Sequence, residues 1–144
     1  MLAAILLSIL GIAAGSAAHV GALLGASRLV HPRAHRFRCF ALAVTLLVVA
    51  HLSEAGFYAA LLWFAEVGLG IGALVGPEGP TSAMDRFYFS LVNFTTLGRG
   101  DLVPTRHLRF LTAIEAFQGF LLITLSGAYL LQILQGRDPM EGRE

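Results

Sequence analysis

The chain has 144 residues, of which 56% are hydrophobic and 13% charged, and its formal net charge is +1. Soluble domains carry about 25% charged residues, so this composition excludes an ordinary soluble domain and predicts an integral membrane protein. The ten basic residues are nearly balanced by nine acidic ones, which argues against nucleic-acid binding, since that role needs a basic excess on one face. A single cysteine, Cys39, excludes an intramolecular disulfide.

The first apolar segment, residues 1–30, predicts a transmembrane helix. Between Leu2 and Ser27 it holds no formal charge, and about 20 apolar residues suffice to cross the hydrocarbon core. A cleaved signal peptide is the alternative, because the small residues at 14–18 resemble a cleavage site. The lack of a basic region before the apolar run, and its continuation past that site, favour a retained helix. His19 is interpreted as a packing or interfacial residue.

Arginines set the expected orientation of the chain in the membrane. The loop at 31–38 holds three arginines and directly follows Arg28. The positive-inside rule makes this loop cytoplasmic and places the N-terminus outside. The segment 39–66 then predicts an outer helix that returns outward, and the glycine- and proline-rich stretch 67–81 predicts an external loop. We expect the chain to lie in the lipid bilayer of the plasma membrane.

The last strongly apolar segment, 108–135, predicts a third transmembrane helix, followed by a cytoplasmic tail at 136–144. A shorter amphipathic helix is expected at 82–95, with a break in the chain at 96–101. About twelve helical residues reach only ~18 Å, which is roughly half of the membrane. Chain that enters and leaves at membrane depth is tolerated only where protein buries it or where it lines a watery cavity. We therefore expect a re-entrant pore helix.

The break at 96–101 contains residues that suit the dehydration of a cation. Gly98 and Gly100 tolerate positive φ, so successive carbonyl groups can be turned to the same side. A ring of carbonyls replaces the hydration shell of an ion, and threonine hydroxyls add further oxygen ligands. The C-terminal end of the short helix brings partial negative charge to the same place. The segment therefore predicts a path for a monovalent cation.

The sequence Thr95-Thr96-Leu97-Gly98-Arg99-Gly100-Asp101 resembles the pore signature T-T-V-G-Y-G-D of potassium channels. More widely, the stretch from Phe87 to Leu131 resembles the small bacterial potassium channel family, a two-pore-domain-type ion channel with a single pore loop per chain. The resemblance implies an all-α membrane protein with three transmembrane helices, a pore helix and a selectivity-filter loop, assembled as a homotetramer. It also implies passive potassium conduction, with K+ held by oxygens of Thr96, Leu97, Gly98, Arg99 and Gly100.

Arg99 departs from the family, which has an aromatic residue, usually tyrosine, at this position. Arg99 can point back into the protein beside a carboxylate, since an unpaired buried charge is costly. Alternatively, the filter conducts cations with weak selectivity, or four guanidinium groups repel cations and the protein is a non-conducting or anion-passing membrane subunit. The candidate partners of Arg99 are the carboxylates of Asp101, Glu54 and Glu115, and the rings of Tyr88 and Phe89.

A few other residues are candidates for function. His51 and Glu54 share one helix face and form either a packing pair or a proton sensor. Glu115 either supports the pore helix or pairs with an external arginine. Gly119 and Gly127 suit either a hinge or close helix packing. Because the sequence holds no catalytic, metal-cluster or phosphate-binding motif, we expect no enzyme, no cofactor besides K+ in the filter, no nucleic acid and no small-molecule substrate.

Overall fold

The computed structural model describes residues 1–29, 36–77, 79 and 81–137. Within these residues, three helices are long and apolar enough to cross a membrane, over Leu2–Leu29, Phe37–Gly68 and Leu108–Leu134. This confirms the predicted all-α membrane fold with three transmembrane helices. The predicted basic loop and the predicted cytoplasmic tail fall mostly outside the described residues.

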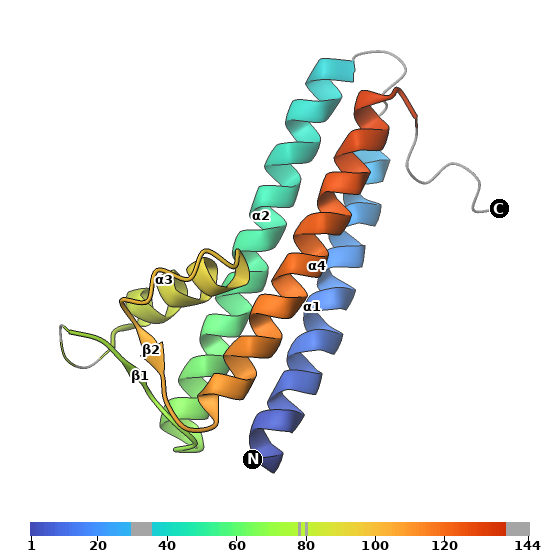
Figure 1. Ribbon diagram of the computed structural model, residues 1–144. Helices are drawn as coiled ribbons and strands as arrows, with labels where there is room; N and C mark the ends of the chain where they lie inside the picture. Colours follow the sequence, from blue (N-terminus) through green and yellow to red (C-terminus); the bar gives the residue numbers. More distant parts are fainter. Residues whose placement is uncertain (30–35, 78, 80, 138–144) are drawn as a thin grey trace.

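In chain order the elements are α1 (Leu2–Leu29), α2 (Arg36–Trp63), a π-helical turn η1 (Phe64–Gly68), β1 (Leu74–Val75), α3 (Ala83–Phe94), β2 (Val103–Pro104) and α4 (Leu108–Leu134). Figure 1 shows α1, α2 and α4 running side by side, with the shorter α3 set at an angle against this bundle. The N-terminus lies at the same end of the bundle as β1 and β2, whereas α4 ends at the opposite end (Figure 1). The short α3 therefore lies against the side of the bundle, partway along its length (Figure 1).

The region 67–81, expected to be an external loop, contains one strand of a short antiparallel sheet, whose second strand follows α3. Leu74 of β1 lies opposite Pro104 of β2, and Val75 lies opposite Val103. The backbone N–H of Thr105 donates to the carbonyl oxygen of Ala73 at 2.9 Å, and the Thr105 hydroxyl lies 2.9 Å from the Ala73 amide nitrogen. The segments before and after α3 are thereby joined.

The turn η1 places an acidic residue beside α3. Arg86 of α3 donates from Nε and Nη2 to Oε2 of Glu66, at 2.9 and 2.8 Å. Its Nη1 donates to the carbonyl oxygens of Thr81 and Ser82, at 2.8 and 3.0 Å. The charge of Arg86 is thus neutralised within the protein, and the start of α3 is attached to the end of α2.

Gln118 of α4 connects the three long helices. Tyr58 of α2 donates a hydrogen bond from its hydroxyl to Oε1 of Gln118. The Nε2 of Gln118 donates to the carbonyl oxygen of Ile12 and to Oγ of Ser16 on α1, both at 3.1 Å. Since Gly15 has no side chain, the Gln118 amide can approach α1 closely. Hydrogen bonds of this kind join helices that the hydrophobic effect alone does not hold together in a lipid bilayer.

Candidate functional site

The short helix α3 begins with a capping box. The Oγ of Ser82 accepts a hydrogen bond from the backbone N–H of Asp85 at 3.1 Å, and the Asp85 carboxylate accepts one from the N–H of Ser82 at 2.7 Å. These hydrogen bonds from Ser82 lower the pKa of Asp85 below its ordinary value. A carboxylate at this end also complements the helix dipole, so the sequence Ser-x-x-Asp determines where α3 begins.

Polar side chains seat α3 between α2 and α4. The Ser90 hydroxyl donates to the carbonyl oxygen of Ala55 on α2 at 2.6 Å and contacts the carboxyl group of Glu115 on α4. The Nδ2 of Asn93 donates to Oε2 of Glu115 at 2.7 Å and to the carbonyl oxygen of Thr112 at 2.8 Å. Glu115 is fully buried. Of its two sequence-based interpretations, the structure therefore favours support of the pore helix over pairing with an external arginine.

The C-terminal end of α3 lies directly against Gly119 of α4. Phe94, the last residue of α3, is fully buried, and a Cβ atom on Gly119 would meet its carbonyl oxygen. In contrast, a Cβ on Gly127 has no atom of the described chain within 4 Å. Close packing therefore accounts for Gly119, whereas Gly127 faces outward.

After α3, the backbone of the predicted filter alternates in the sign of φ. Thr96, Gly98 and Gly100 have φ of +59°, +56° and +76°, whereas Leu97 and Arg99 keep negative φ. Carbonyl groups of a regular strand point alternately to opposite sides, and a change of sign at every second residue turns them toward one side. Glycine makes this conformation accessible at two of the three positions. The sign of φ thus alternates along this segment, which begins where α3 presents its negative dipole end.

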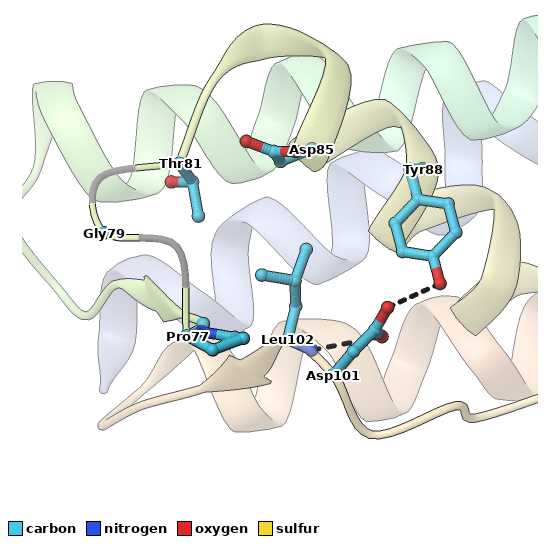
Figure 2. A pocket seen from close by; sticks show the side chains of 8 residues that line it. Pro77, Gly79, Thr81, Asp85, Tyr88, Asp101 and Leu102 are labelled. Atoms are coloured by element: carbon cyan, nitrogen blue, oxygen red, sulfur yellow. Dashed lines mark hydrogen bonds between the residues drawn. The ribbon is translucent and has the colours of Figure 1, made fainter.

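Tyr88 of α3 lies between Arg99 and Asp101. The Cζ of Arg99 lies 5.9 Å from the Tyr88 ring centroid, within the range of a cation–π contact. The Tyr88 hydroxyl donates to Oδ2 of Asp101 at 2.6 Å. Figure 2 shows this bond at the edge of a cavity of about 230 Å³, which is also lined by Asp85. The Tyr88 ring thereby joins the arginine of the filter segment to the carboxylate that follows it.

Two of the carboxylates proposed as partners of Arg99 are engaged elsewhere. Glu54 accepts hydrogen bonds from two histidines, and Glu115 is bound by Ser90 and Asn93. The interpretation of Glu54 and Glu115 as Arg99 partners within the same chain is therefore wrong. Of the three carboxylates expected as partners, Asp101 is the one linked to Arg99 in the described structure. It accepts a hydrogen bond from Tyr88, whose ring also contacts Arg99.

Replacement of Tyr88 by phenylalanine is expected to remove a pH-dependent contribution of Asp101 to stability. The hydrogen bond from Tyr88 lowers the pKa of Asp101. Its stabilising contribution is therefore present above the ordinary aspartate pKa near ~3.9 and is lost as the pH falls through the lower folded-state value. Without the hydroxyl, the pKa of Asp101 rises toward its ordinary value, so Tyr88→Phe is expected to melt at a lower temperature than the wild type near pH ~6, and this difference should shrink as the pH falls below ~4. Thermal melting of both proteins between about pH 3 and 6 measures the change.

Tyr129 provides the matched control for that measurement, because the hydroxyl that Tyr129→Phe removes bonds to Ser27 on α1. We expect any difference in melting temperature between Tyr129→Phe and the wild type to stay constant over this pH range. The same pH dependence in both variants, or a pH-independent difference in Tyr88→Phe, would contradict the assignment.

The expected pair of His51 and Glu54 is present, and His19 joins it. The Nδ1 of His51 lies 2.9 Å from Oε2 of Glu54, and the Nδ1 of His19 lies 2.9 Å from Oε1. His19 is completely buried. Its interpretation as a plain packing or interfacial residue missed this bond; an ionisable side chain inside an apolar span was the signal that pointed to it.

Comparison with known proteins agrees with this geometry. A family model described as "Ion channel" matches residues 40–136, about two thirds of the chain, from α2 to the end of α4. The chain belongs to this ion channel family. The matched region includes the α3 helix and the segment with alternating φ, whereas α1 precedes it.

One curated relative of this ion channel is an uncharacterized membrane protein, YdjJ, of Bacillus subtilis (strain 168). The two are 48% identical over 56 residues, which cover 38% of this chain and 16% of the relative. The chain therefore corresponds to a small part of that protein's length. No solved structure matches the chain.

Proposed function

We propose that this ion channel conducts monovalent cations, with potassium as the principal ion, through a filter formed by residues 95–101. The observation that supports this most directly is the alternation of φ at Thr96, Gly98 and Gly100. Oxygens of Thr96, Leu97, Gly98, Arg99 and Gly100 would replace the hydration shell of K+. The negative end of α3 beside Thr95 favours a cation at the inner side of the filter.

A homotetramer is the assembly that this function requires. Residues 95–101 are all exposed in the single chain, and one row of oxygens cannot enclose an ion. Four copies around a cyclic axis would supply a closed cage of carbonyls. We place this tetramer in the plasma membrane, with the N-terminus and the β1–β2 sheet outside and the end of α4 in the cytoplasm, as the positive-inside rule suggests.

The contacts of Arg99 support cation conduction despite its charge. The guanidinium group lies over the Tyr88 ring of α3, and the same ring binds Asp101. An arginine held beside α3 leaves the axis of the filter to the backbone carbonyls. The nearby Asp101 carboxylate offsets part of its charge, because opposite charges at short range favour each other's ionised forms.

Potassium flux in proteoliposomes tests the proposal. With an outward potassium gradient and a potential-sensitive dye, the wild-type chain is expected to generate a potassium diffusion potential. Gly98→Ala is expected to reduce the flux at least tenfold, because alanine is strained at a φ of +56°. Gly21→Ala, a glycine with open space around its Cβ on α1, is the matched control and should conduct as wild type.

Arg99→Tyr distinguishes the remaining interpretations. If Arg99 sits behind a selective filter, the tyrosine variant and the wild type both favour potassium over sodium. A wild type that passes sodium and potassium equally, or no cation at all, would instead support the weakly selective or the non-conducting subunit. Recovery of selective potassium flux in Arg99→Tyr would then assign that defect to the arginine.

A further inference from the structure

Four polar side chains from three helices meet in the interior of the bundle. His19 comes from α1, His51 and Glu54 from α2, and Ser126 from α4. His19, Glu54 and Ser126 are at most 5% exposed, and His51 is largely buried. We call this group the His–Glu–Ser cluster. Nothing in the proposed conduction path uses it.

The His–Glu–Ser cluster is arranged almost symmetrically. Each imidazole presents Nδ1 to one oxygen of Glu54, at 2.9 Å in both cases. Each presents Nε2 to the same hydroxyl of Ser126, at 3.1 Å from His51 and 3.3 Å from His19. The two rings are stacked, with centroids 5.2 Å apart and planes 24° from parallel. The two histidines thus bridge a carboxylate on one side and a hydroxyl on the other.

The four hydrogen bonds of the cluster require four hydrogen atoms. A carboxylate supplies none, each neutral imidazole supplies one, and a hydroxyl supplies one. The sum is three, so one further proton must be present for every contact to be a hydrogen bond. This count does not depend on whether that proton resides on a histidine or on Glu54. With it, the cluster has no net charge.

We propose that the His–Glu–Ser cluster is a proton-binding site that holds one titratable proton, and that this proton attaches the inner helix α4 to α1 and α2. When the proton leaves, both Nδ1–H groups are still needed by the charged Glu54. The Ser126 hydroxyl then has one hydrogen for the two Nε2 atoms of His19 and His51. One of these two hydrogen bonds is therefore lost, and both of them reach α4. The deprotonated cluster also leaves a net negative charge inside the membrane, which is unfavourable.

The groups around the cluster leave this proton count unchanged. On α2, the next turn carries Tyr58, whose hydroxyl donates to Gln118. On α4, Tyr129 lies one turn after Ser126 and bonds to Ser27, while Glu115 is bound by residues of α3. From α3, the Phe94 ring faces the cluster, with its centroid 5.7 Å from that of the His51 ring.

A proton fits the cluster better than a metal ion does. The ligand atoms of His19, His51 and Glu54 are separated by up to 4.8 Å. A tetrahedral zinc ion with bonds of ~2.0–2.1 Å needs ligand atoms roughly 3.3 Å apart. All three side chains are instead already at hydrogen-bond distance from one another or from Ser126.

Glu54 is also the member of the cluster that borders a groove of about 410 Å³ between α1 and α2. The other walls of this groove are mostly small or apolar side chains, such as Ala14, Ala18 and Phe57.

Nitrogen-15 NMR of histidine-labelled, lipid-reconstituted protein tests the site itself. His19→Gln and His51→Gln assign the two rings among the five histidines. At neutral pH we expect His19, His51 and Glu54 together to hold one proton more than two neutral imidazoles and an ionised carboxylate would hold. That proton should be lost in a single step as the pH is raised. Two neutral imidazole rings beside an ionised Glu54 at every pH, or a spectrum that changes when bound zinc is removed, would overturn the proposal.

Thermal melting tests the link to α4. The wild-type melting temperature is expected to fall by a few degrees as the proton is lost, and this step should be absent from His19→Gln and Ser126→Ala. Ser53→Ala is the matched control, because its hydroxyl donates to the Val49 carbonyl oxygen of its own helix. A step that persists in Ser126→Ala would overturn the link. Neither measurement depends on ion conduction, so a failure of the proposed channel function is recognised separately.

Discussion

Substitution of Gly119 by alanine is expected to abolish ion flux and to destabilise the protein. A Cβ at this position meets the carbonyl oxygen of Phe94, which is backbone and cannot rotate away. Overpacking of this kind typically costs ~1–3 kcal/mol. The end of α3 must move, and the filter begins at the next residue, Thr95. We expect at least a tenfold loss of flux in proteoliposomes, together with a lower melting temperature.

Gly127→Ala separates the packing role of Gly119 from a hinge. It lies on the same helix, but no atom of the described chain is within 4 Å of its Cβ position. If packing matters, only Gly119→Ala has a large effect. If flexibility of α4 matters, both variants reduce flux while the melting temperature stays the same or rises, since alanine favours helix. Wild-type flux and melting in Gly119→Ala would refute the packing argument.

The positive φ of the two glycines in the proposed filter segment could be predicted from the sequence because it is a local property of the residue type. Gly98 and Gly100 adopt positive φ in the structure, and glycine is the residue that makes such a backbone inexpensive. Thr96 shares this conformation without being glycine, and the sequence alone does not indicate that. The three long helices were equally predictable, since uninterrupted apolar stretches of this length suit the membrane.

The polar contacts between helices were not predictable in the same way. His19 and Glu54 are 35 positions apart, and Arg86 and Glu66 are 20 apart. Helical periodicity relates residues three or four positions apart, which is why the pair of His51 and Glu54 was recognised. Which residues of α1 face α2 depends on the rotation of each helix, and apolar helices of this kind carry little pattern to fix it.

The β1–β2 sheet was missed for a related reason. Each strand has two residues, which is too short to show the alternation that identifies strands. Its pairing of Val75 with Val103 spans the whole of α3 and the filter. It forms because the segment between β1 and β2 folds back and brings its own two ends together. This is a tertiary effect, which the local sequence of the strand residues does not predict.

Glu115 is the other residue at which we expect a large effect, and its hydrogen bonds specify which substitution is tolerated. The Ser90 hydroxyl has one hydrogen but contacts two oxygens that ordinarily accept, the Ala55 carbonyl and the Glu115 carboxyl. Both contacts are satisfied if the Glu115 carboxyl is protonated and donates to Ser90. Its other oxygen accepts from Asn93 at 2.7 Å. A neutral carboxyl is also what a completely buried position favours.

Glutamine reproduces that arrangement, whereas leucine does not. The amide of Glu115→Gln can donate to Ser90 and accept from Asn93, so we expect flux and melting close to wild type. Glu115→Leu leaves these buried partners unsatisfied, at ~1–3 kcal/mol for each such group, and is expected to lower the melting temperature by several degrees and to eliminate flux. Thr124→Leu, at an exposed position of α4, controls for added leucine. If glutamine were as damaging as leucine, a charged Glu115 would be required, and α3 would be held by an ion rather than by neutral hydrogen bonds.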